Sequence, residues 1–329
     1  MTRVGFVGCG PFASSMHYPS VFEVEGVEVA AIAERDAERA RAAGKRFGIG
    51  RLYNDAGEML RSETLDAVYC IMQPQELRDV LPGVLERAPA VFIEKPPGLG
   101  YAELAAWARL AEKRGVLTMV GFNRRYSALL GRAREAALEG GRIKFVAAQF
   151  FKNDPHPTYK GIRHAPLLGT IIHAVDVLVW LGGRFRAVHG NAASASGSVL
   201  DLYSAAIEFE GGALGSLAAD FAACGRIERY EIHAEKRSCA VEPPENMRIF
   251  ESPDGEPREI SAGDVVPGAD APGAFEEYPP ERRARRIYGF VEEHRRFIEC
   301  VRSGAEPETS FARSLETMRL VEAIAGLSG

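Results

Sequence analysis

The sequence predicts an α/β protein in two parts: an N-terminal doubly wound parallel sheet and a C-terminal α+β domain with a large, mainly antiparallel sheet. The first part is predicted by apolar strands that alternate with helical stretches as far as Gly121, and by a glycine-rich turn after the first strand. The second is predicted by strand and hairpin patterns beyond residue 140. Because 329 residues exceed one typical domain, we expect domains over residues 1–122 and 123–329, with the C-terminal helix packed back on the first.

The composition argues against several kinds of partner. The formal net charge of −5 disfavours nucleic acids and anionic membranes, which attract concentrated positive charge. No apolar run reaches the roughly 18 residues of a membrane span. We interpret MTRVGFVGCG as a strand because it has no long apolar core or cleavage site. The cysteines are odd in number and widely spaced, so we interpret them as small hydrophobic residues and expect no metal site and a cytoplasmic location; they are Cys9, Cys70, Cys224, Cys239 and Cys300.

A glycine-rich turn follows the first expected strand, Arg3–Val7. In the pattern GxGxxA, the first glycine allows a tight turn, the second lets the backbone approach a pyrophosphate, and the alanine permits close helix–strand packing. The helix that follows directs its free N–H groups and positive dipole end at the phosphates. The predicted cofactor residues of the turn are Gly8, Gly10, Pro11, Phe12 and Ala13.

Glu34 comes directly after the second expected strand, Val27–Ala33. A carboxylate at this place accepts hydrogen bonds from the adenosine ribose hydroxyls and repels a 2′-phosphate, so it favours NAD. Arg35, in contrast, is placed to bind that phosphate. We therefore expect NAD as the cofactor, with NADP as the alternative, and we place both Glu34 and Arg35 in the cofactor site.

Further βα units continue the parallel sheet. Ligands of such sheets bind beyond the carboxyl ends of the strands. The expected strands are Ala67–Met72, Ala90–Glu94 and Leu117–Gly121, and the expected helices are Asp36–Phe47, Leu77–Arg87 and Tyr101–Arg114. Residues at or just beyond the strand ends complete the predicted cofactor site; they are Gln73, Pro74, Glu94, Lys95 and Asn123.

Lys95 stands at the end of the strand AVFIEKP. Pro96 disfavours helical dihedrals at the residue before it, so the chain stays extended and holds the lysine at the rim of the sheet. A lysine that is partly desolvated beside a nicotinamide is suited to act as an acid or a base. The plainer interpretation of the same residues is a surface ion pair.

The apolar stretch LLGTIIHAVDVLVWLGG, residues 167–183, predicts a helix that carries two polar residues in an apolar face. His173 and Asp176 are three residues apart and are therefore neighbours on that helix. They form either a buried, satisfied pair or part of an active site. The polar loop over residues 152–166 precedes the helix, and its Arg163 and His164 are candidates for substrate binding.

Several segments resemble the Gfo/Idh/MocA family of oxidoreductases, over essentially the whole chain. They are GFVGCGPFA, AIAERD, IEKP, MVGFNRRY, HAVDVLVWLGG and FIECVRSGAEPETS. The resemblance implies a Rossmann domain followed by an α/β domain with a large antiparallel sheet, and it implies that Lys95 and His173 form the catalytic pair. Asp176 then has a structural role, in which it orients His173 or caps a neighbouring group. The segments GFNRRY and IIHAVD are most similar to the branch of MviM-like virulence factors.

Two departures from the family pattern bear on the substrate. Many members have an aspartate one turn before the histidine, in a DxGxHxxD pattern, where this chain has Gly169. The family's TPPxxH after the fourth strand is replaced by QPQELR at residues 73–78. Both changes weaken any inference of a specific substrate from the family's members. They are also compatible with a protein that binds the cofactor without the usual turnover.

Strand and hairpin patterns fill the C-terminal domain. A turn at Glu210–Gly212 joins the two strands of a hairpin, and Ser252–Pro280 is expected to be flexible. Because one face of such a sheet stays open unless it is covered, we expect a homodimer or homotetramer through the C-terminal sheet. The expected strands are Arg142–Phe151, Asp201–Phe209, Ala213–Phe221, Tyr230–Ala234 and Met247–Phe250, and the expected terminal helices are Glu281–Cys300 and Phe311–Ala325.

The sequence thus predicts an NAD(P)-dependent oxidoreductase that interconverts a hydroxyl and a ketone on a sugar, polyol or cyclitol. Such polyhydroxylated substrates suit a polar pocket, whose expected residues are Lys95, Asn123, Arg163, His164 and His173. One alternative is an NAD-dependent glycosidase that keeps its cofactor bound. The other is a non-catalytic NAD(P)-binding sensor or partner protein.

Overall fold

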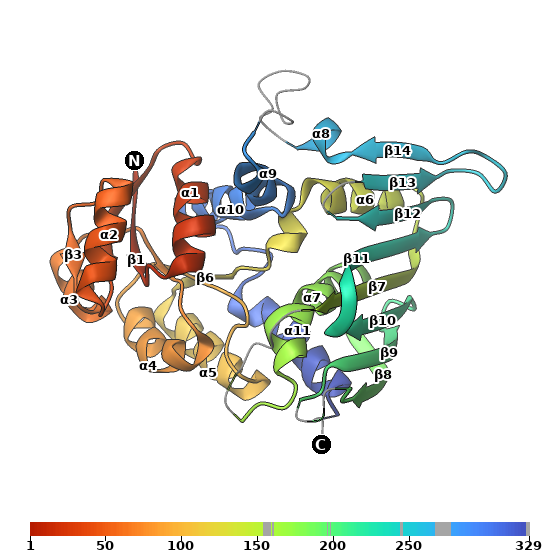
Figure 1. The fold of residues 1–329 in the computed structure, drawn as a ribbon, viewed down its shortest axis with the longest axis horizontal. Coiled ribbons are helices and arrows are strands. Elements are labelled where there is room, and N and C mark those ends of the chain that lie inside the picture. Colours follow the sequence, from red (N-terminus) through yellow and green to blue (C-terminus); the bar gives the residue numbers. More distant parts are fainter. Residues whose placement is uncertain are drawn as a thin grey trace. The chain divides into compact units, whose positions relative to one another are not determined.

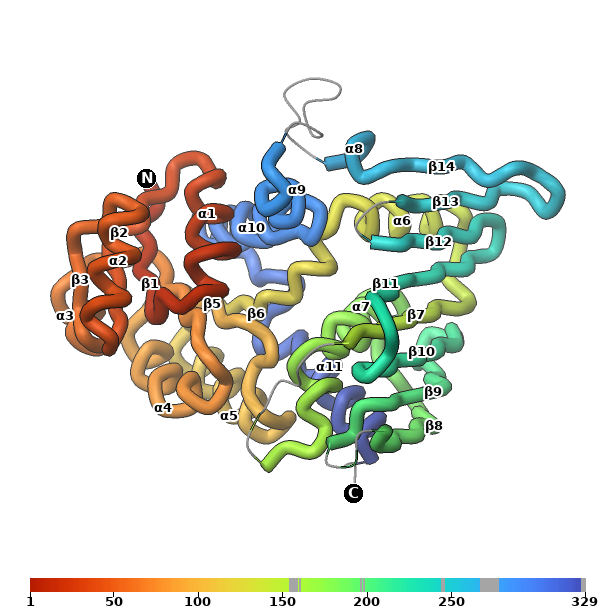
Figure 2. The backbone as a smooth tube through the Cα atoms, in the orientation of Figure 1, coloured from red at the N-terminus to blue at the C-terminus, as the bar shows by residue number. Residues whose placement is uncertain are grey.

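The computed structural model describes residues 1–153, 159, 161–195, 197, 199–243, 246–266 and 278–326. The chain forms two compact units, which can be followed by colour in Figure 1 and Figure 2. The first unit contains Met1–Phe122 and Phe290–Leu315, and the second contains Asn123–Gly289 and Glu316–Gly329. A C-terminal segment of the chain therefore belongs to the same unit as the N-terminal sheet.

The described part of the first unit contains a six-stranded, all-parallel sheet, which confirms the predicted fold class. Its strand order is β3-β2-β1-β4-β5-β6, so the order reverses between β1 and β4. In an open sheet of this kind, ligands bind beyond the carboxyl ends of the strands at the point of reversal. The strands are β1 (Thr2–Val7), β2 (Val27–Ala33), β3 (Leu52–Tyr53), β4 (Ala67–Cys70), β5 (Ala90–Ile93) and β6 (Leu117–Val120).

The helices of the first unit follow the predicted alternation with two differences. The helix after β4 begins at Pro74 and not at Leu77, because proline is favoured in the first helical turn. The short elements β3 and α3 were not predicted from the sequence. The helical segments are a π-helical turn at Ala13–His17, α1 (Tyr18–Phe22), α2 (Ala37–Phe47), α3 (Ala56–Ser62), α4 (Pro74–Leu85), α5 (Tyr101–Arg114), α10 (Phe290–Ser303) and the start of α11 (Phe311–Ile324).

The described part of the second unit contains an eight-stranded sheet in the order β14-β13-β12-β11-β7-β10-β9-β8. The pair β7–β10 is parallel and the other described pairs are antiparallel, so the prediction of a mainly antiparallel sheet is confirmed. The strands are β7 (Ile143–Asn153), β8 (Phe185–Ala193), β9 (Leu202–Phe209), β10 (Leu214–Asp220), β11 (Ala222–Ala234), β12 (Ser238–Glu242), β13 (Asn246–Phe250) and β14 (Arg258–Ser261).

Helices cover one face of this second sheet. Helix α6 (Ala128–Glu139) packs on β11, β12 and β13, and α7 (Ile172–Gly182) packs on β7 and β10. The strands alternate accordingly: on β7, Val146, Ala148 and Phe150 are fully or almost fully buried. The opposite face, which we call the outer face, presents the alternate residues of the same strands; among them are Leu202, Ser204, Ala206, Leu214, Ser216, Ala218 and Ile227.

Three predictions for the C-terminal third need correction. The strand expected over Tyr230–Ala234 is longer, because β11 begins at Ala222. Part of the stretch expected to be flexible is ordered, because β14 and α8 (Ala262–Val265) lie in it and Ser261 and Asp264 form a capping box; residues 267–277 lie outside the described part. The single helix expected over Glu281–Cys300 is divided into α9 (Pro280–Ile287) and α10. The division falls at Gly289, whose φ of +83° is a left-handed conformation that glycine adopts readily.

None of the helices in the described ranges combines the length and the hydropathy needed to cross a membrane.

Candidate active site

The glycine turn after β1 is tight at its first glycine and open at its second. Gly8 has a φ of +93°, and a Cβ atom there would lie 2.3 Å from the carbonyl oxygen of Ile71, so only glycine fits. A Cβ atom at Gly10 would meet no atom within 4 Å. The backbone at Gly10 is therefore accessible to a ligand. Gly8, in contrast, packs closely against Ile71, the residue that follows β4.

Glu34 lies directly against this turn. Its Oε2 atom accepts a hydrogen bond from the backbone N–H of Cys9 at 3.1 Å, and its Oε1 atom accepts one from the backbone N–H of Asp36 at 3.1 Å. Asp36 in turn caps α2, because its carboxylate accepts from the backbone N–H groups of Glu38 and Arg39. The end of β2 is thus tied both to the glycine turn and to the following helix, which brings Glu34 and the turn together.

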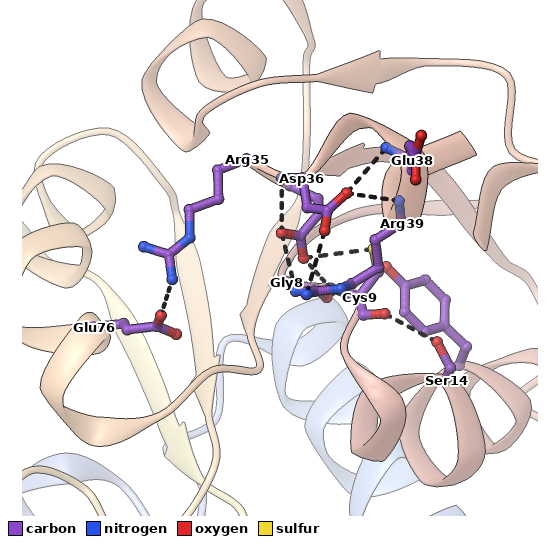
Figure 3. Close-up of polar contacts among 10 residues, drawn as sticks. Gly8, Cys9, Ser14, Arg35, Asp36, Glu38, Arg39 and Glu76 are labelled. Atoms are coloured by element: carbon purple, nitrogen blue, oxygen red, sulfur yellow. Dashed lines mark hydrogen bonds and ion pairs between the residues drawn. The ribbon is translucent and has the colours of Figure 1, made fainter. Parts of the chain in front are cut away.

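The side chain of Arg35 pairs with the carboxylate of Glu76 (Figure 3). Its guanidinium forms a hydrogen-bonded ion pair with Glu76, in the first turn of α4. The side chain of Arg35 is 78% exposed, so the pair itself contributes little to stability. Glu34, Asp36 and Glu76 therefore give the surroundings of Arg35 an acidic character.

The cysteines have no disulfide partners. Burial and the adjacent Glu34 carboxylate raise the pKa of the Cys9 thiol to about 12, and burial raises the pKa of Cys70 to about 12 and that of Cys239 to about 11. These thiols stay protonated at physiological pH and are poor nucleophiles. Cys224, in contrast, is exposed.

Lys95 follows β5 and is half-buried. Its backbone N–H donates to Glu94 Oε2 at 2.9 Å. The other carboxylate oxygen of Glu94, Oε1, lies 3.1 Å from Nε2 of His17, and a Cβ atom at Gly121 would come within 2.9 Å of it. Glu94 is only 7% exposed, so its carboxylate faces the protein interior and holds the backbone of the lysine. The contact of Glu94 with the cofactor stays a prediction.

Gln73 and Pro74 form the start of α4. Gln73 is exposed and occupies the N-cap position, where its carbonyl oxygen accepts from the N–H groups of Glu76 and Leu77. Pro74 is buried in the first turn. Both residues lie beyond the carboxyl end of β4, one of the two strands between which the strand order reverses.

Asn123, at the start of the second unit, has a structural contact. It is 1% exposed, and its Nδ2 group donates to the carbonyl oxygen of Tyr288 at 2.8 Å. Next to it, a Cβ atom at Gly289 would lie 2.3 Å from the carbonyl oxygen of Asn123. The segment at Asn123 and the segment at Tyr288–Gly289 are therefore in direct contact, and the buried side chain of Asn123 connects them by a hydrogen bond.

His173 occupies the first turn of α7 and is 7% exposed. A π-helical turn at Leu167–Ile171, which includes Gly169, directly precedes it. Such turns are rare and are frequent at functional sites. Asp176, one turn later, is fully buried and pairs with the guanidinium of Arg125. The structure shows Asp176 in a buried ion pair, and its expected role in orienting His173 stays a prediction.

Arg163 and His164 lie just before this π-helical turn. Arg163 is exposed, and its carbonyl oxygen accepts from the N–H of Leu200 at 2.7 Å. His164 is 8% exposed, and burial lowers the pKa of its imidazole, partly opposed by the Glu322 carboxylate. The neutral form of His164 is therefore favoured. The preceding loop residues 154–158 and 160 lie outside the described part of the chain.

Sequence reasoning missed two further histidines, His17 and His294. They contact one another in the interior of the first unit, with 3.1 Å between Nδ1 of His17 and Nε2 of His294. One signal was available: His17 lies four residues after the glycine-turn pattern ends, about one helical turn further on. Of the predicted catalytic pair, Lys95 belongs to the first unit and His173 to the second.

Comparisons with known proteins match both units. Residues 2–122 match the family described as "Oxidoreductase family, NAD-binding Rossmann fold", and residues 132–240 match the "GFO/IDH/MocA C-terminal domain". The chain is 27% identical to D-apiose dehydrogenase of Paraburkholderia graminis, over 96% of this chain and 85% of that protein. It is 24% identical to myo-inositol 2-dehydrogenase of Thermotoga maritima, over 94% and 90% of the two chains.

A solved structure of levoglucosan dehydrogenase, in complex with NADH and levoglucosan, has the same fold. It matches with a TM-score of 0.83 at 21% identity and covers 99% of this chain and 96% of that one. The two family regions together cover most of the chain, and the strand order and glycine turn are those of a dinucleotide-binding sheet. The chain therefore belongs to the Gfo/Idh/MocA family and is an NAD-dependent oxidoreductase.

Proposed function

We propose that the protein interconverts a hydroxyl and a ketone on a sugar, polyol or cyclitol. The relatives named for D-apiose and myo-inositol support this substrate class, because both compounds carry several hydroxyl groups. One observation carries the proposal: Lys95 lies just after the end of β5, next to Glu94, and the glycine turn directly follows β1, at the same edge of one parallel sheet. An ionisable side chain thereby stands on the cofactor side of the sheet.

The residues around the glycine turn fit a dinucleotide. Gly10 leaves its backbone open to a pyrophosphate, and Glu34 lies against the turn, where a ribose is recognised. Glu34 disfavours a 2′-phosphate, and Arg35 is already paired with Glu76. We therefore propose a preference for NAD over NADP. The other residues proposed for the cofactor site are Gly8, Pro11, Phe12, Ala13, Gln73, Pro74, Glu94, Lys95 and Asn123.

Two side chains are proposed to act on the substrate. When bound, NAD supplies the hydride acceptor in oxidation and, as NADH, the hydride donor in reduction. Lys95 or His173 takes the proton of the substrate hydroxyl in oxidation and returns it in reduction. Arg163 and His164 bind further hydroxyls, and the neutral imidazole of His164 offers both a donor and an acceptor for them.

A non-catalytic cofactor-binding protein is the second candidate. The observation that favours it is Gly169, at the place where many relatives have an aspartate one turn before the histidine. Glycine offers no side chain for a substrate hydroxyl or for proton transfer. The further assignment to the MviM-like branch is supported by the segments GFNRRY and IIHAVD and stays part of the proposal.

We also propose that the protein assembles through the outer face of the second sheet. On β9 and β10 this face carries small side chains, such as Ser204, Ala206 and Ala218, and its apolar residues Leu214 and Ile227 are 53% and 51% exposed. Small residues beside exposed apolar side chains suit packing against a second copy. The expected assembly is a homodimer or homotetramer.

The function is tested by a screen of aldoses, polyols and cyclitols with NAD and with NADP, followed by the absorbance of the reduced cofactor. We expect turnover of at least one compound, with NAD preferred. Lys95→Ala and His173→Ala are expected to lower turnover by about 10²–10⁴-fold while NAD binding stays close to that of the parent protein. Lys113→Ala, which removes an exposed lysine of α5, serves as the matched control.

The outcomes separate the candidates. Wild-type turnover in both the Lys95 and the His173 variants would overturn their catalytic roles. Tight NAD binding without turnover of any compound, in either direction, would favour the non-catalytic protein.

A further inference from the structure

A continuous chain of polar contacts runs behind Lys95 inside the first unit. Nε2 of His294 lies 3.1 Å from Nδ1 of His17, and Nε2 of His17 lies 3.1 Å from Oε1 of Glu94. The other oxygen of the same carboxylate accepts the backbone N–H of Lys95 at 2.9 Å. Three short contacts thus connect helix α10 to the backbone of the proposed catalytic lysine.

The members of this chain come from three separate segments. His17 ends the π-helical turn that follows the glycine turn, Glu94 follows β5, and His294 lies on α10. Helix α10 is far away in sequence but belongs to the same unit. This series of contacts therefore connects the glycine turn, the end of strand β5 and helix α10.

The surroundings of these contacts are apolar, and the contact of His17 Nε2 with Glu94 Oε1 is a close approach of two polar atoms without hydrogen-bond geometry. His17 and His294 are fully buried, and aromatic rings enclose them, including those of Phe92 and Phe290, with ring centroids 5–6 Å from the imidazoles. In such a medium a hydrogen bond is electrostatically stronger than in water, and a misplaced polar group is costly. Glu94 consequently has few alternatives to its contact with His17.

Burial and the neighbouring His17 favour a neutral His294. Burial, and then the neighbouring His17, lower the pKa of His294 well below its ordinary value. The other titratable groups that face the pair are Glu94, Glu293 and Tyr69. A neutral imidazole has one donor and one acceptor nitrogen, so His294 can present either to His17 without adding a second positive charge to the interior.

We propose that His17 and His294 are positioning residues for Lys95, which they hold in place through the Glu94 carboxylate. The proposal rests on the role proposed above for Lys95. His17 fixes the carboxylate, the carboxylate fixes the lysine backbone, and His294 fixes the ring of His17. His17 also ends the π-helical turn that follows the glycine turn. The same contact therefore fixes the position of Lys95 relative to the glycine turn.

The cluster also offers the ligand atoms of a metal site. One ligand atom each from His17, Glu293 and His294 lies within 4.8 Å of the others. The 3.1 Å between the two imidazole nitrogens, however, is the length of a direct hydrogen bond. The proposal therefore predicts that the purified protein contains no stoichiometric metal, as measured by mass spectrometry of the elements.

The first test compares His17→Leu, which breaks both contacts, with His17→Gln, whose amide can still donate to Glu94. We expect kcat of His17→Leu to fall by about 10–100-fold, the effect of a small misplacement of a catalytic group, and the pH profile of kcat to move. The KM for NAD is expected to change by less than about threefold, and His17→Gln to recover most of kcat. His294→Leu is expected to give an intermediate loss of kcat. His189→Leu, at an exposed histidine of β8, is the matched control.

A second test does not depend on turnover. The rate of reductive methylation of Lys95, measured by peptide mass spectrometry, reports how its side chain is held. We expect His17→Leu to change this rate by about threefold or more, while the rates at the exposed Lys113 and Lys144 stay constant. If the wild-type protein turned over no substrate, the catalytic role would fail, and this measurement would still decide the positioning role.

The proposal is overturned by any of three results. One is a folded His17→Leu protein with the kcat, pH profile and Lys95 methylation rate of the wild type. Another is a loss of NAD affinity in proportion to the loss of kcat, which would indicate a general structural role. The third is a stoichiometric metal that is lost in His294→Leu.

Discussion

Asp176 and Arg125 form a buried, two-pronged ion pair, in which Nε and Nη2 of the guanidinium each lie 2.7 Å from one carboxylate oxygen. The hydroxyl of Thr317 donates to the same carboxylate at 2.9 Å. The pair ties the segment before α6 to α7 and α11, one helical turn after His173. The helix that carries the proposed catalytic histidine is thus held by a buried ion pair. The side chain of Arg125 is 8% exposed and that of Asp176 is 1% exposed.

Removal of one partner of this pair should destabilise the second unit strongly. Asp176→Ala leaves the buried guanidinium without its carboxylate, and we expect the free energy of unfolding to fall by about 3–5 kcal/mol in urea titrations. Glu208→Ala, which removes the partner of the exposed Arg186, should cost less than about 1 kcal/mol. The apolar double variant Arg125→Met/Asp176→Leu should recover much of the loss. Equal stability of Asp176→Ala and the wild type would contradict the account.

Glu34 should set both the affinity for NAD and the discrimination against NADP. Glu34→Ser removes the carboxylate that faces the turn, and we expect the Kd for NAD to rise about tenfold or more, because a hydrogen bond to a charged group contributes about 1.5–3 kcal/mol. The ratio of NADP to NAD affinity should rise at the same time, because the repulsion of a 2′-phosphate is lost. Isothermal titration calorimetry measures both constants. Glu38→Ser, at an exposed position of α2, is the control, and an unchanged Kd in Glu34→Ser would exclude the proposed ribose contact.

The stability of the first unit should depend on pH through His294. Its pKa in the folded protein is depressed by burial and by His17, so below about pH 6.5 the unfolded chain binds a proton that the folded chain does not. The free energy of unfolding should therefore fall as the pH falls from about 6.5, by up to about 1.4 kcal/mol per pH unit for this one group. His294→Gln should flatten this slope in urea titrations between about pH 7.5 and 5.5. The same slope in variant and wild type would assign the pH dependence to other groups.

A charge on the outer face should prevent assembly. We expect light scattering after gel filtration to show a dimer or tetramer for the wild type, and monomers for Ile227→Asp, because a buried, unpaired carboxylate is not tolerated at an interface. Leu138→Asp changes a comparably exposed leucine of α6, outside this face, and should leave the assembly intact. A monomeric wild type, or an Ile227→Asp protein that still assembles, would contradict this proposal.

Local patterns predicted most of the fold. The strand Val27–Ala33 and the helix Tyr101–Arg114 have the bounds expected from the sequence, because each combines a clear apolar period with an unambiguous end. The two-residue strand β3 could not be predicted, since two residues show no period. The break at Gly289 was missed for another reason: its left-handed conformation serves a close contact with Asn123, which is distant in sequence.

The same limit applies to the candidate site. The glycine turn, Glu34 and Lys95 stand at strand ends, so their location follows from the alternation of strands and helices. The contacts of Asp176 with Arg125, and of His17 with His294, join residues 51 and 277 positions apart. Nothing in the local pattern indicates which polar residue will meet which, because these pairings are set by how the elements pack. For Asp176 the available signal was a polar residue within an apolar helical stretch.

The central claim is that Lys95 and His173 act together on one substrate hydroxyl beside NAD. It is tested most directly by a crystal structure with NAD and a polyol that the protein oxidises, identified in the substrate screen. The account predicts that Lys95 Nζ and an imidazole nitrogen of His173 both lie within hydrogen-bond reach, about 2.6–3.2 Å, of the same hydroxyl, with its carbon facing C4 of the nicotinamide. A complex in which either side chain lies away from that hydroxyl, or in which the nicotinamide does not reach Lys95, would contradict it.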